Sequence, residues 1–564
     1  MKKNISRIFL TIASLFVFSA CTNLDEIWYD RVTPGTFFKS KEDVYAALYR
    51  PFTHARWYVI NDRWVINEES ADQFISSTKG PHWYNGGDHV RLNQHEWTAT
   101  DGRIWETWRG TLMGVALAID TRSDLQNVNY ESLALTQKDK DDHITQLDVL
   151  TAYFYLRGLD FFGGMPIFTS NEGENVPRAT PKEVFDHVEK IIKTALPKLA
   201  KRPLGFSNDG AITQGSAAAM LAQLYFNAKS YIGESRDAEC DAICKDIISG
   251  VYGNYALATN WQQPFNFDNA KSDEMLWGIP SAFKMLEYNW FFNVFYHYSA
   301  PEFFDMDIGG PWNGSHFQPS LTPGGTEYTF NIGKPFARFN KEDLRKRQYK
   351  YKGGKNYEGM MLFGPQLKPN GEPCLGTQEY SGEPLVLVDQ VARFSELKDK
   401  NSPNFGKDPK DLESKVQTGE ENSGVRLMKI PIPNKANNSL RWASHHQVIR
   451  LTEIYYMRAE IMFNKGDLAG AAAIFNQIRA RNFENGADPD PVTTANLNKY
   501  RLASEWGIEF LGEGRRRTDL IRWGMFHTED WWGHKAHNDK NKCVFPVPEN
   551  AISGNNALVQ NPGY

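Results

Sequence analysis

The sequence predicts a mostly α-helical fold in which helix pairs form a scaffold and a long irregular half packs against them. Over residues 36–250 and 440–530, apolar residues recur at helical spacing, which favours amphipathic helices. Between about 250 and 440 this periodicity fades, and glycine, proline, asparagine and aromatic residues dominate. Long irregular segments of this kind in compact proteins usually carry function. With 41% hydrophobic residues, the 564-residue chain can bury a large core.

The N-terminal part of the scaffold is predicted to contain four helices, over residues 41–56, 145–162, 181–200 and 215–229. Ser40 is a candidate N-cap for the first helix. The third helix has the best start signal, because Thr180 can cap it, Pro181 suits its first position and Glu183 falls in its first turn. One stripe of the fourth helix carries side chains at helical spacing, namely Ala218, Leu221, Tyr225 and Ala228.

The clearest helix pair lies near the C-terminus, over residues 448–462 and 468–478. Gly466 and Asp467 interrupt the chain between the two helices, so the helices must run antiparallel. Small residues such as Ala459 and Ala471 let the two backbones approach closely. The pair resembles a tetratricopeptide unit of about 34 residues. We therefore predict a tetratricopeptide-like helix-pair scaffold with an irregular, loop-rich half.

The first 20 residues have the pattern of a secretory signal peptide. A positively charged head precedes an apolar run over residues 8–18 and a small-residue cleavage site. Cys21 follows this site, at the position where a bacterial lipoprotein carries its lipid. Asp25 and Glu26 are similar to the acidic export tag of bacterial surface lipoproteins. We predict lipidation at Cys21; the alternative is an ordinary cleaved signal followed by a chance cysteine.

Composition excludes two classes of protein. A net charge of −5 argues against nucleic-acid binding, which requires a concentrated basic face. Five cysteines are too few for a disulfide-stabilised scaffold of this length. A Cys240–Cys244 disulfide is possible but geometrically awkward, so isolated thiols are favoured at the four remaining positions, which are Cys240, Cys244, Cys374 and Cys543.

Four sequence blocks carry a family resemblance. In chain order they read AYFYL with FGGMP at 152–166, VIRLTEIYYMRAE at 448–460, EFLGEGRR with DLIRW at 509–523, and FPVP with QNPGY at 545–564. Together they resemble the SusD/RagB family of nutrient-binding outer-membrane lipoproteins. Two departures are visible, Phe18 before the lipidation cysteine and Thr452 in the second block.

The resemblance implies a single SusD-like domain over residues 21–564, following a signal peptide over residues 1–20. It also implies a lipid-anchored, non-enzymatic protein of the cell surface. Such a protein captures oligosaccharide, or peptide in some members, and delivers it to a SusC-like TonB-dependent transporter in the outer membrane. Two further hypotheses from other classes stay open, a surface glycosidase and a purely structural surface scaffold.

The charged residues of the family blocks are predicted to be structural. They lie on or beside helices, where opposite charges three or four residues apart form ion pairs. Buried pairs of this kind would hold helix pairs in register, and removing one partner would be strongly destabilising. The residues concerned are Arg450, Glu453, Arg458, Glu460, Glu509, Glu513 and Arg515.

Two aromatic segments are the candidate ligand sites. A sugar presents flat apolar faces edged by hydroxyl groups, so its site needs exposed aromatic rings together with polar groups that fix its orientation. The first segment is a Gly- and Pro-rich loop with candidate residues Asp72, His82, Trp83, Tyr84 and Asn85. The second segment supplies Trp290, Tyr296 and Trp312, the last of them between turn residues.

No catalytic or metal-binding set is predicted. The sequence contains no nucleophile elbow, phosphate-binding loop or dinucleotide fingerprint. The pairs His445-His446 and His534-x-x-His537 do not complete a zinc ligand set by their spacing. No cofactor is expected, and a structural calcium is possible without any sequence mark for it.

Overall fold

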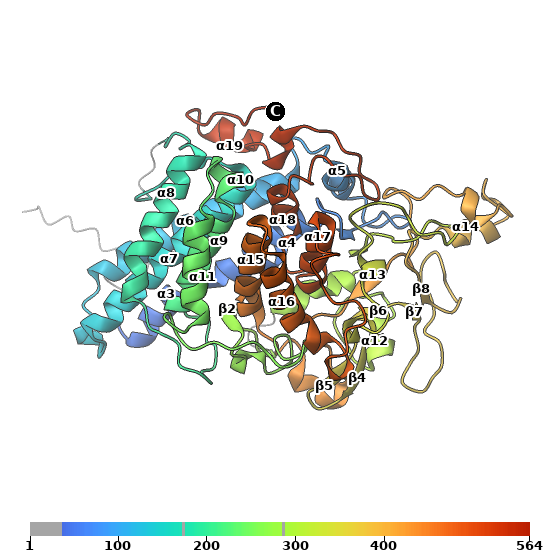
Figure 1. The fold of residues 1–564 in the computed structure, drawn as a ribbon, viewed down its shortest axis with the longest axis horizontal. Coiled ribbons are helices and arrows are strands. Elements are labelled where there is room, and N and C mark those ends of the chain that lie inside the picture. The colour runs from blue at the N-terminus through green and yellow to red at the C-terminus, as the bar shows by residue number, and fades with distance from the viewer. Residues whose placement is uncertain (1–36, 172–174, 285–287) are drawn as a thin grey trace, which may run out of the picture.

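The computed structural model describes residues 37–564 except 172–174 and 285–287, so the predicted signal peptide and Cys21 lie outside the described residues. Long helices dominate one half of this part, and loops with short strands dominate the other (Figure 1). The helices are α3 (Lys41–Trp57), α4 (Arg63–Glu68), α5 (Asp88–Gln94), α6 (Gly102–Asn127), α7 (Gln137–Phe162), α8 (Pro181–Ala195), α9 (Gln214–Phe226), α10 (Ala228–Ile232), α11 (Asp237–Ile248), α12 (Ala300–Phe304), α13 (Pro335–Arg338), α14 (Phe394–Lys398), α15 (Leu451–Asn464), α16 (Leu468–Arg479), α17 (Lys499–Glu509), α18 (Arg516–Arg522) and α19 (Glu549–Gly554).

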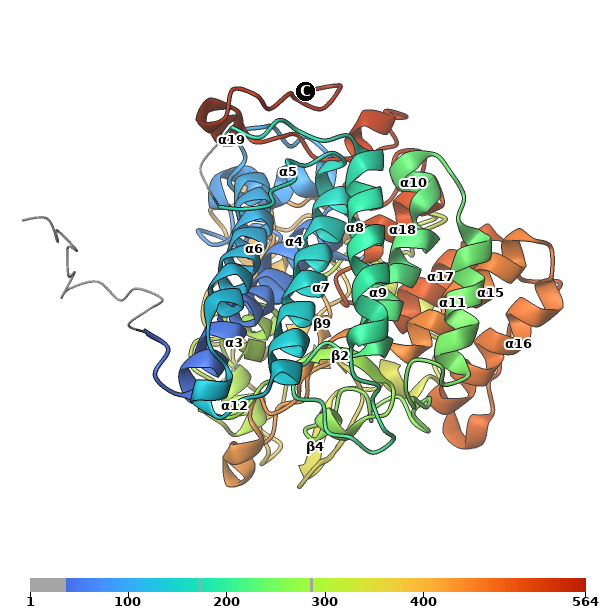
Figure 2. The same cartoon turned by 90° about the vertical axis from the view of Figure 1, so that its left-hand side faces the viewer.

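The scaffold is a row of helices, each packed against the next (Figure 2). The row runs α6, α7, α8, α9, α11, α15 and α16. Small residues allow the closest approaches, since a Cβ atom at Gly114 of α6 would lie 2.4 Å from the ring of Phe154 on α7. The row therefore joins an N-terminal set of helices to the C-terminal pair α15–α16, which lies more than 200 residues further along the chain.

The irregular half is tied together by short antiparallel strand pairs. The pairs are β1 (Phe74–Ile75) with β3 (His316–Phe317), β2 (Met275–Ile279) with β10 (His446–Arg450), β4 (Lys350–Gly353) with β5 (Asn356–Glu358), β6 (Met361–Leu362) with β9 (Arg426–Leu427), and β7 (Gly364–Pro365) with β8 (Val386–Leu387). The pair β1–β3 matters for the site, because it brings the 74–85 segment beside residues 312–317.

The predicted helices are confirmed where capping residues marked them. Ser40 and Thr180 cap α3 and α8 in full capping boxes, and Asp467 caps α16 after the Gly466 turn. Two predicted starts are wrong. Helix α7 begins at Gln137 rather than near residue 145, capped by Thr136. Residues 448–450 belong to strand β10, so α15 begins at Leu451.

The predicted salt-bridge lattice is confirmed, and most of its members are buried. Arg450 contacts Glu274 at 3.1 Å and both Glu509 and Glu513 at 2.8 Å. Arg481 pairs with Glu274 and Glu509 as well, at 2.6 and 2.8 Å. These contacts join the irregular half to the start of α15 and the end of α17, so they fix the two halves against each other.

Two further observations concern the whole described chain. Within the described ranges, no helix has both the length and the apolar character needed to cross a bilayer.

The prediction of isolated thiols is confirmed, since Cys240, Cys244, Cys374 and Cys543 are all free. The Cys240 and Cys244 sulfur atoms lie 4.0 Å apart, within hydrogen-bond reach, and form no disulfide.

Candidate functional site

Four tryptophans from separate segments surround one surface cavity of about 210 Å³. Trp57 ends helix α3, Trp83 lies on the 80–85 loop, Trp290 lies on a short 3₁₀ helix, and Trp312 lies on the loop before β3. The remaining lining residues are Val65, Glu69, His89, Arg103, Phe291, Val294 and Ser315. The cavity is therefore aromatic on its walls and polar at a few defined points.

The rings form a connected set. Trp57 stacks on Trp290 with 5.7 Å between centroids and 28° between planes. Trp290 meets Trp312 edge to face at 5.2 Å and 72°. Trp57 is 42% exposed, and the other three rings are half-buried. These spacings are typical of favourable aromatic pairs, so each ring stabilises the position of its neighbour. The exposed part of each ring remains accessible to a ligand.

The backbone holds Trp83 in place. Trp83 has a positive φ of 65°, as do Asn85 (44°), Gly86 (64°) and Gly87 (86°). The Trp83 indole N–H donates to the carbonyl oxygen of Trp312 at 2.9 Å. A Cβ atom at Gly314 would lie 2.3 Å from the Trp83 ring, so the ring packs directly on the glycine backbone. The two predicted loops are thus joined through this ring.

The floor of the cavity is a buried ionic network. The Glu69 carboxylate contacts Nδ1 of His89 and accepts hydrogen bonds from the hydroxyl groups of Ser76 and Ser315, both at 2.7 Å. Burial alone would raise the pKa of Glu69, but His89 and the two hydroxyl groups outweigh burial and lower this pKa to about 2. The Glu69 carboxylate is therefore ionised at neutral pH.

One guanidinium faces the cavity without a fixed partner. Arg103 lies in the first turn of α6, and within the described chain its side chain makes no ion pair or hydrogen bond. Its planar N–H groups are thus available to a ligand's oxygen atoms.

Three predicted residues meet at this cavity, and three lie beside it. Trp83, Trp290 and Trp312 line it. His82, Tyr84 and Asn85 are exposed on the same loop without lining the cavity, and Tyr84 is 60% exposed. The rim of the site therefore offers further polar and aromatic groups.

Two predicted residues do not belong to the site. Asp72 is completely buried, where it pairs with both Nε and Nη2 of Arg516 at 2.6 and 2.9 Å. Tyr296 is 1% exposed and stacks on Trp442 in the core. Both residue types suit sugar binding, but their packing removes them from solvent, and this packing depends on contacts far along the chain.

Sequence reasoning missed Trp57, Glu69 and Arg103. Trp57 could have been found from the sequence, because a large aromatic residue at the end of a predicted amphipathic helix is often exposed to solvent. Arg103 and Glu69 had none, since the loops that enclose them come from residues 290–315.

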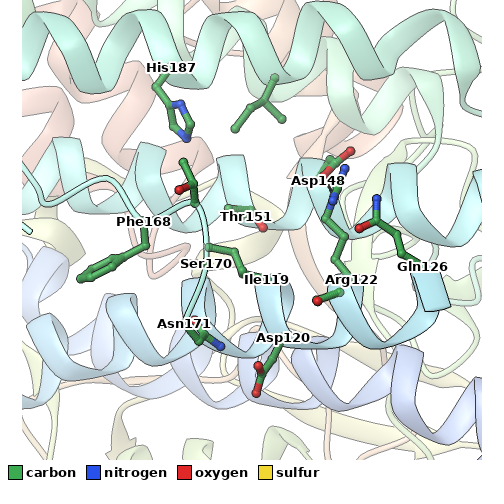
Figure 3. Close-up of a pocket in the computed structure, with 13 residues that line it drawn as sticks. Ile119, Asp120, Arg122, Gln126, Asp148, Thr151, Phe168, Ser170, Asn171 and His187 are labelled. Atoms are coloured by element: carbon green, nitrogen blue, oxygen red, sulfur yellow. Dashed lines mark hydrogen bonds and ion pairs between the residues drawn. The ribbon is translucent and has the colours of Figure 1, made fainter. Parts of the chain in front are cut away.

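A second cavity of about 560 Å³ lies between α6, α7, α8 and the 168–171 segment. Figure 3 shows Arg122 beside Asp148 on one side and His187 on the other. The Arg122–Asp148 ion pair measures 2.6 Å and is partly exposed. None of the predicted ligand residues lines this cavity, and it lacks the aromatic walls of the tryptophan cavity.

Comparison with known proteins gives the family. A model of the SusD family matches residues 249–564. The starch-binding protein SusD of Bacteroides thetaiotaomicron is 36% identical over 124 residues, which is 21% of this chain and 21% of that protein. The chain thus spans about a fifth of the length of this curated relative.

Solved structures match over nearly the whole chain. Surface glycan-binding protein A from Bacteroides thetaiotaomicron aligns with a TM-score of 0.64 at 16% identity, covering 93% of this chain and all of that one. A SusD-like protein from Bacteroides fragilis aligns with a TM-score of 0.63 at 17% identity, covering 94% of this chain and 98% of that one. These likenesses establish a shared fold. The family match over more than half of the chain, together with this fold, shows that the chain belongs to the SusD/RagB family.

Proposed function

We propose that this protein captures oligosaccharide or polysaccharide at the tryptophan cavity and delivers it to a SusC-like TonB-dependent transporter. In this proposal residues 21–564 form one SusD-like domain, held on the cell surface of the outer membrane by lipid on Cys21. The observation that carries the proposal is the convergence of Trp57, Trp83, Trp290 and Trp312 on one open cavity.

The chemistry of the cavity suits a sugar. The C–H face of a pyranose ring is flat and apolar, so it can cover an indole face and remove apolar area from water. Arg103 and the exposed Asn85 supply N–H donors for the hydroxyl groups at the ring edge. The names of a starch-binding relative and a surface glycan-binding neighbour agree with this chemistry.

The same cavity favours binding without bond cleavage. Glycosidases require a pair of carboxyl groups, one of them protonated as the general acid. Among the described residues that line the cavity, Glu69 is the one carboxylate. Its pKa of about 2 keeps it ionised, so it cannot donate a proton at neutral pH.

A panel of polysaccharides tests the binding proposal. Native affinity gels containing starch, xylan, β-glucan, arabinan or mannan should retard the wild-type protein in at least one case. The double variant Trp290→Ala/Trp312→Ala should migrate as in a glycan-free gel. Binding of peptides from a parallel panel, with no glycan bound, would favour peptide capture instead. Release of new reducing ends would contradict the non-enzymatic proposal.

The anchor and the transporter have separate tests. The wild-type protein, expressed in its native host, should incorporate labelled palmitate and sediment with the outer membrane. Cys21→Ser should lose both properties. A SusC-like barrel should co-purify with the wild-type protein after mild detergent extraction, and its absence would contradict the delivery step alone.

A further inference from the structure

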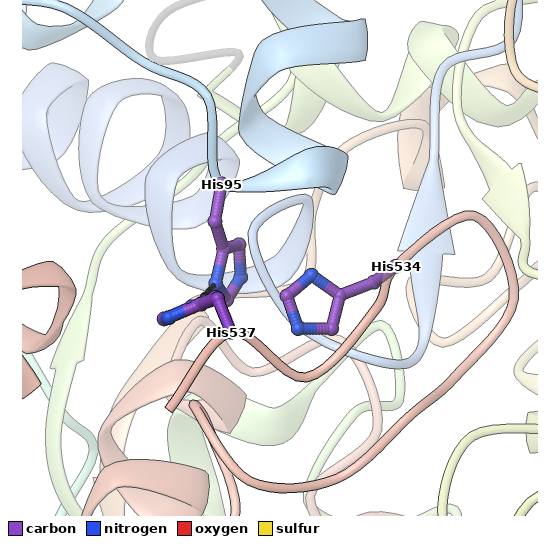
Figure 4. A group of neighbouring side chains, drawn as sticks. All are labelled: His95, His534 and His537. Atoms are coloured by element: carbon purple, nitrogen blue, oxygen red, sulfur yellow. Dashed lines mark hydrogen bonds between the residues drawn. The ribbon is translucent and has the colours of Figure 1, made fainter. Parts of the chain in front are cut away.

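Three histidines from distant parts of the sequence meet at the C-terminal end of α5, whereas His89 of the tryptophan cavity lies in the first turn of this helix. His95 caps the C-terminal end of α5, and His534 and His537 lie on the loop after Trp531 (Figure 4). One ring nitrogen from each lies within 4.8 Å of the other two. The His95 Nδ1 and His537 Nε2 atoms are already 3.0 Å apart.

Several buried polar groups at this point lack a hydrogen-bond partner among the described residues. His534 is 2% exposed, and neither of its ring nitrogens makes a hydrogen bond. The Asn93 backbone lies close to His534, but its geometry falls short of a hydrogen bond. The side-chain amide of Asn93 and the indole nitrogen of Trp531 are also unsatisfied. Buried polar atoms are normally paired, so this cluster indicates a group that completes the site.

The orientation of His95 suits a metal ligand. Its Nε2–H donates to the carbonyl oxygen of Ser70 at 2.8 Å, which leaves the Nδ1 lone pair facing the other two rings. A backbone carbonyl in this position is the usual partner that orients a metal-binding histidine and makes it more basic. The rings of Trp531 and Phe526 stack on His534 and His95 at 3.8 and 4.1 Å and restrict their rotation.

We propose that His95, His534 and His537 bind a divalent zinc ion, with water as the fourth ligand. Three imidazole nitrogens and an open position form an established zinc ligand set, whereas calcium and magnesium prefer oxygen ligands. Nitrogens bound to tetrahedral zinc at about 2.0–2.1 Å lie about 3.4 Å apart. The His95–His537 pair is near that spacing, and the widest pair must close by about 1.4 Å.

Zinc binding at His537 requires its ring proton to move from one nitrogen to the other. Its Nδ1 accepts a hydrogen bond from the Asp539 backbone N–H at 3.1 Å, so the ring proton lies on Nε2. When zinc binds Nε2, this proton moves to Nδ1 and the bond to Asp539 is replaced by water. His537 is partly exposed, which gives water access to that nitrogen.

A zinc ion here would join the end of α5 to the C-terminal loop. Helix α5 has seven residues and carries His89, part of the cavity floor, in its first turn. Zinc would therefore hold α5 from the end opposite the cavity. This inference is independent of what the cavity binds, since zinc content can be measured without any glycan.

Metal content tests the proposal directly. The untagged chain is incubated with excess Zn²⁺, desalted and analysed by plasma mass spectrometry, with a chromophoric chelator to measure affinity. We expect one zinc per chain. Excess Ca²⁺ should not displace it. His537→Ala, at the partly exposed position, should lower zinc affinity by at least about 10-fold, the effect of losing even an orienting partner.

Two further variants make the test decisive. His534→Ala removes the most buried of the three ligands and should abolish zinc retention, with its fold checked by circular dichroism. The control His187→Ala removes a partly exposed histidine from the distant cavity of Figure 3 and should retain one zinc. Zinc loading should slow amide exchange in α5 in the wild-type protein. Zinc-free wild-type protein after loading would overturn the proposal and assign the site to water. Unchanged zinc content in His534→Ala would overturn it by showing that the zinc binds elsewhere.

Discussion

Replacing Trp57 with alanine tests the tryptophan cavity most cleanly. Trp57 leaves 42% of its surface exposed and makes no side-chain hydrogen bond in the described chain. A tryptophan presents about 250 Å², so about 105 Å² is open to a ligand. At about 25 cal/mol per Å², complete burial of this area by a sugar would contribute about 2.6 kcal/mol to the free energy of binding. Burial of one face of the ring would contribute about half of that.

Trp57→Ala should therefore weaken glycan binding about 10- to 100-fold. The assay is isothermal titration calorimetry with the best oligosaccharide from the affinity gels. The matched control is Tyr49→Ala, because Tyr49 lies two turns earlier on α3, is 46% exposed and does not line the cavity. Trp57→Ala affinity within twofold of wild type, or an equal loss in Tyr49→Ala, would refute the reasoning.

Variants at Gly314 beneath Trp83, at Arg450 in the salt-bridge lattice and at Glu69 in the cavity floor give three further predictions. Gly314→Ala should push the Trp83 ring out of place and lower glycan affinity about tenfold in the same calorimetry, because the added Cβ would lie 2.3 Å from that ring. Arg450→Ala should cost about 3–5 kcal/mol in chemical unfolding, since it leaves buried carboxylates unpaired. Glu69 has a folded pKa of about 2, below its ordinary 4.5. Its contribution of about 3 kcal/mol is present above pH 4.5 and is lost as the pH falls toward 2, so Glu69→Gln should flatten this acid limb in urea titrations.

Each of these predictions has a control. Gly554→Ala adds a methyl group in open space and should leave binding unchanged. Arg458→Ala breaks a partly exposed pair with Asp241 and should cost at most about 1 kcal/mol. Full affinity in Gly314→Ala, or equal losses in the two arginine variants, would contradict the roles given to Gly314 and Arg450. An unchanged acid limb in Glu69→Gln would assign the acid sensitivity to other carboxylates.

The sequence predicted helices where local signals existed. Capping residues marked α3 and α8, and the Gly466 turn marked the α15–α16 pair. Helix α6 was missed because glycine and threonine, such as Thr107, Gly110 and Gly114, interrupt the apolar residues of its buried face.

The candidate site was predictable only in part. Aromatic residues among turn residues identified Trp83 and Trp312, which the structure places half-buried in the wall of the cavity. Asp72 was wrongly included because its burial depends on Arg516, 444 residues away. His95 and His537 are 442 residues apart in the sequence, and no local sequence pattern predicts a contact over such a separation.

The positive φ angles of Trp83, Asn85, Gly86 and Gly87 have a kinetic consequence. Left-handed conformations are costly for residues other than glycine, and here the folded protein already bears that cost before any ligand arrives. A recognition loop that is shaped in advance needs no rearrangement on encounter. Stopped-flow traces should then be single exponentials whose rate rises linearly with sugar concentration. Differences in affinity among glycans should come from how slowly each one leaves.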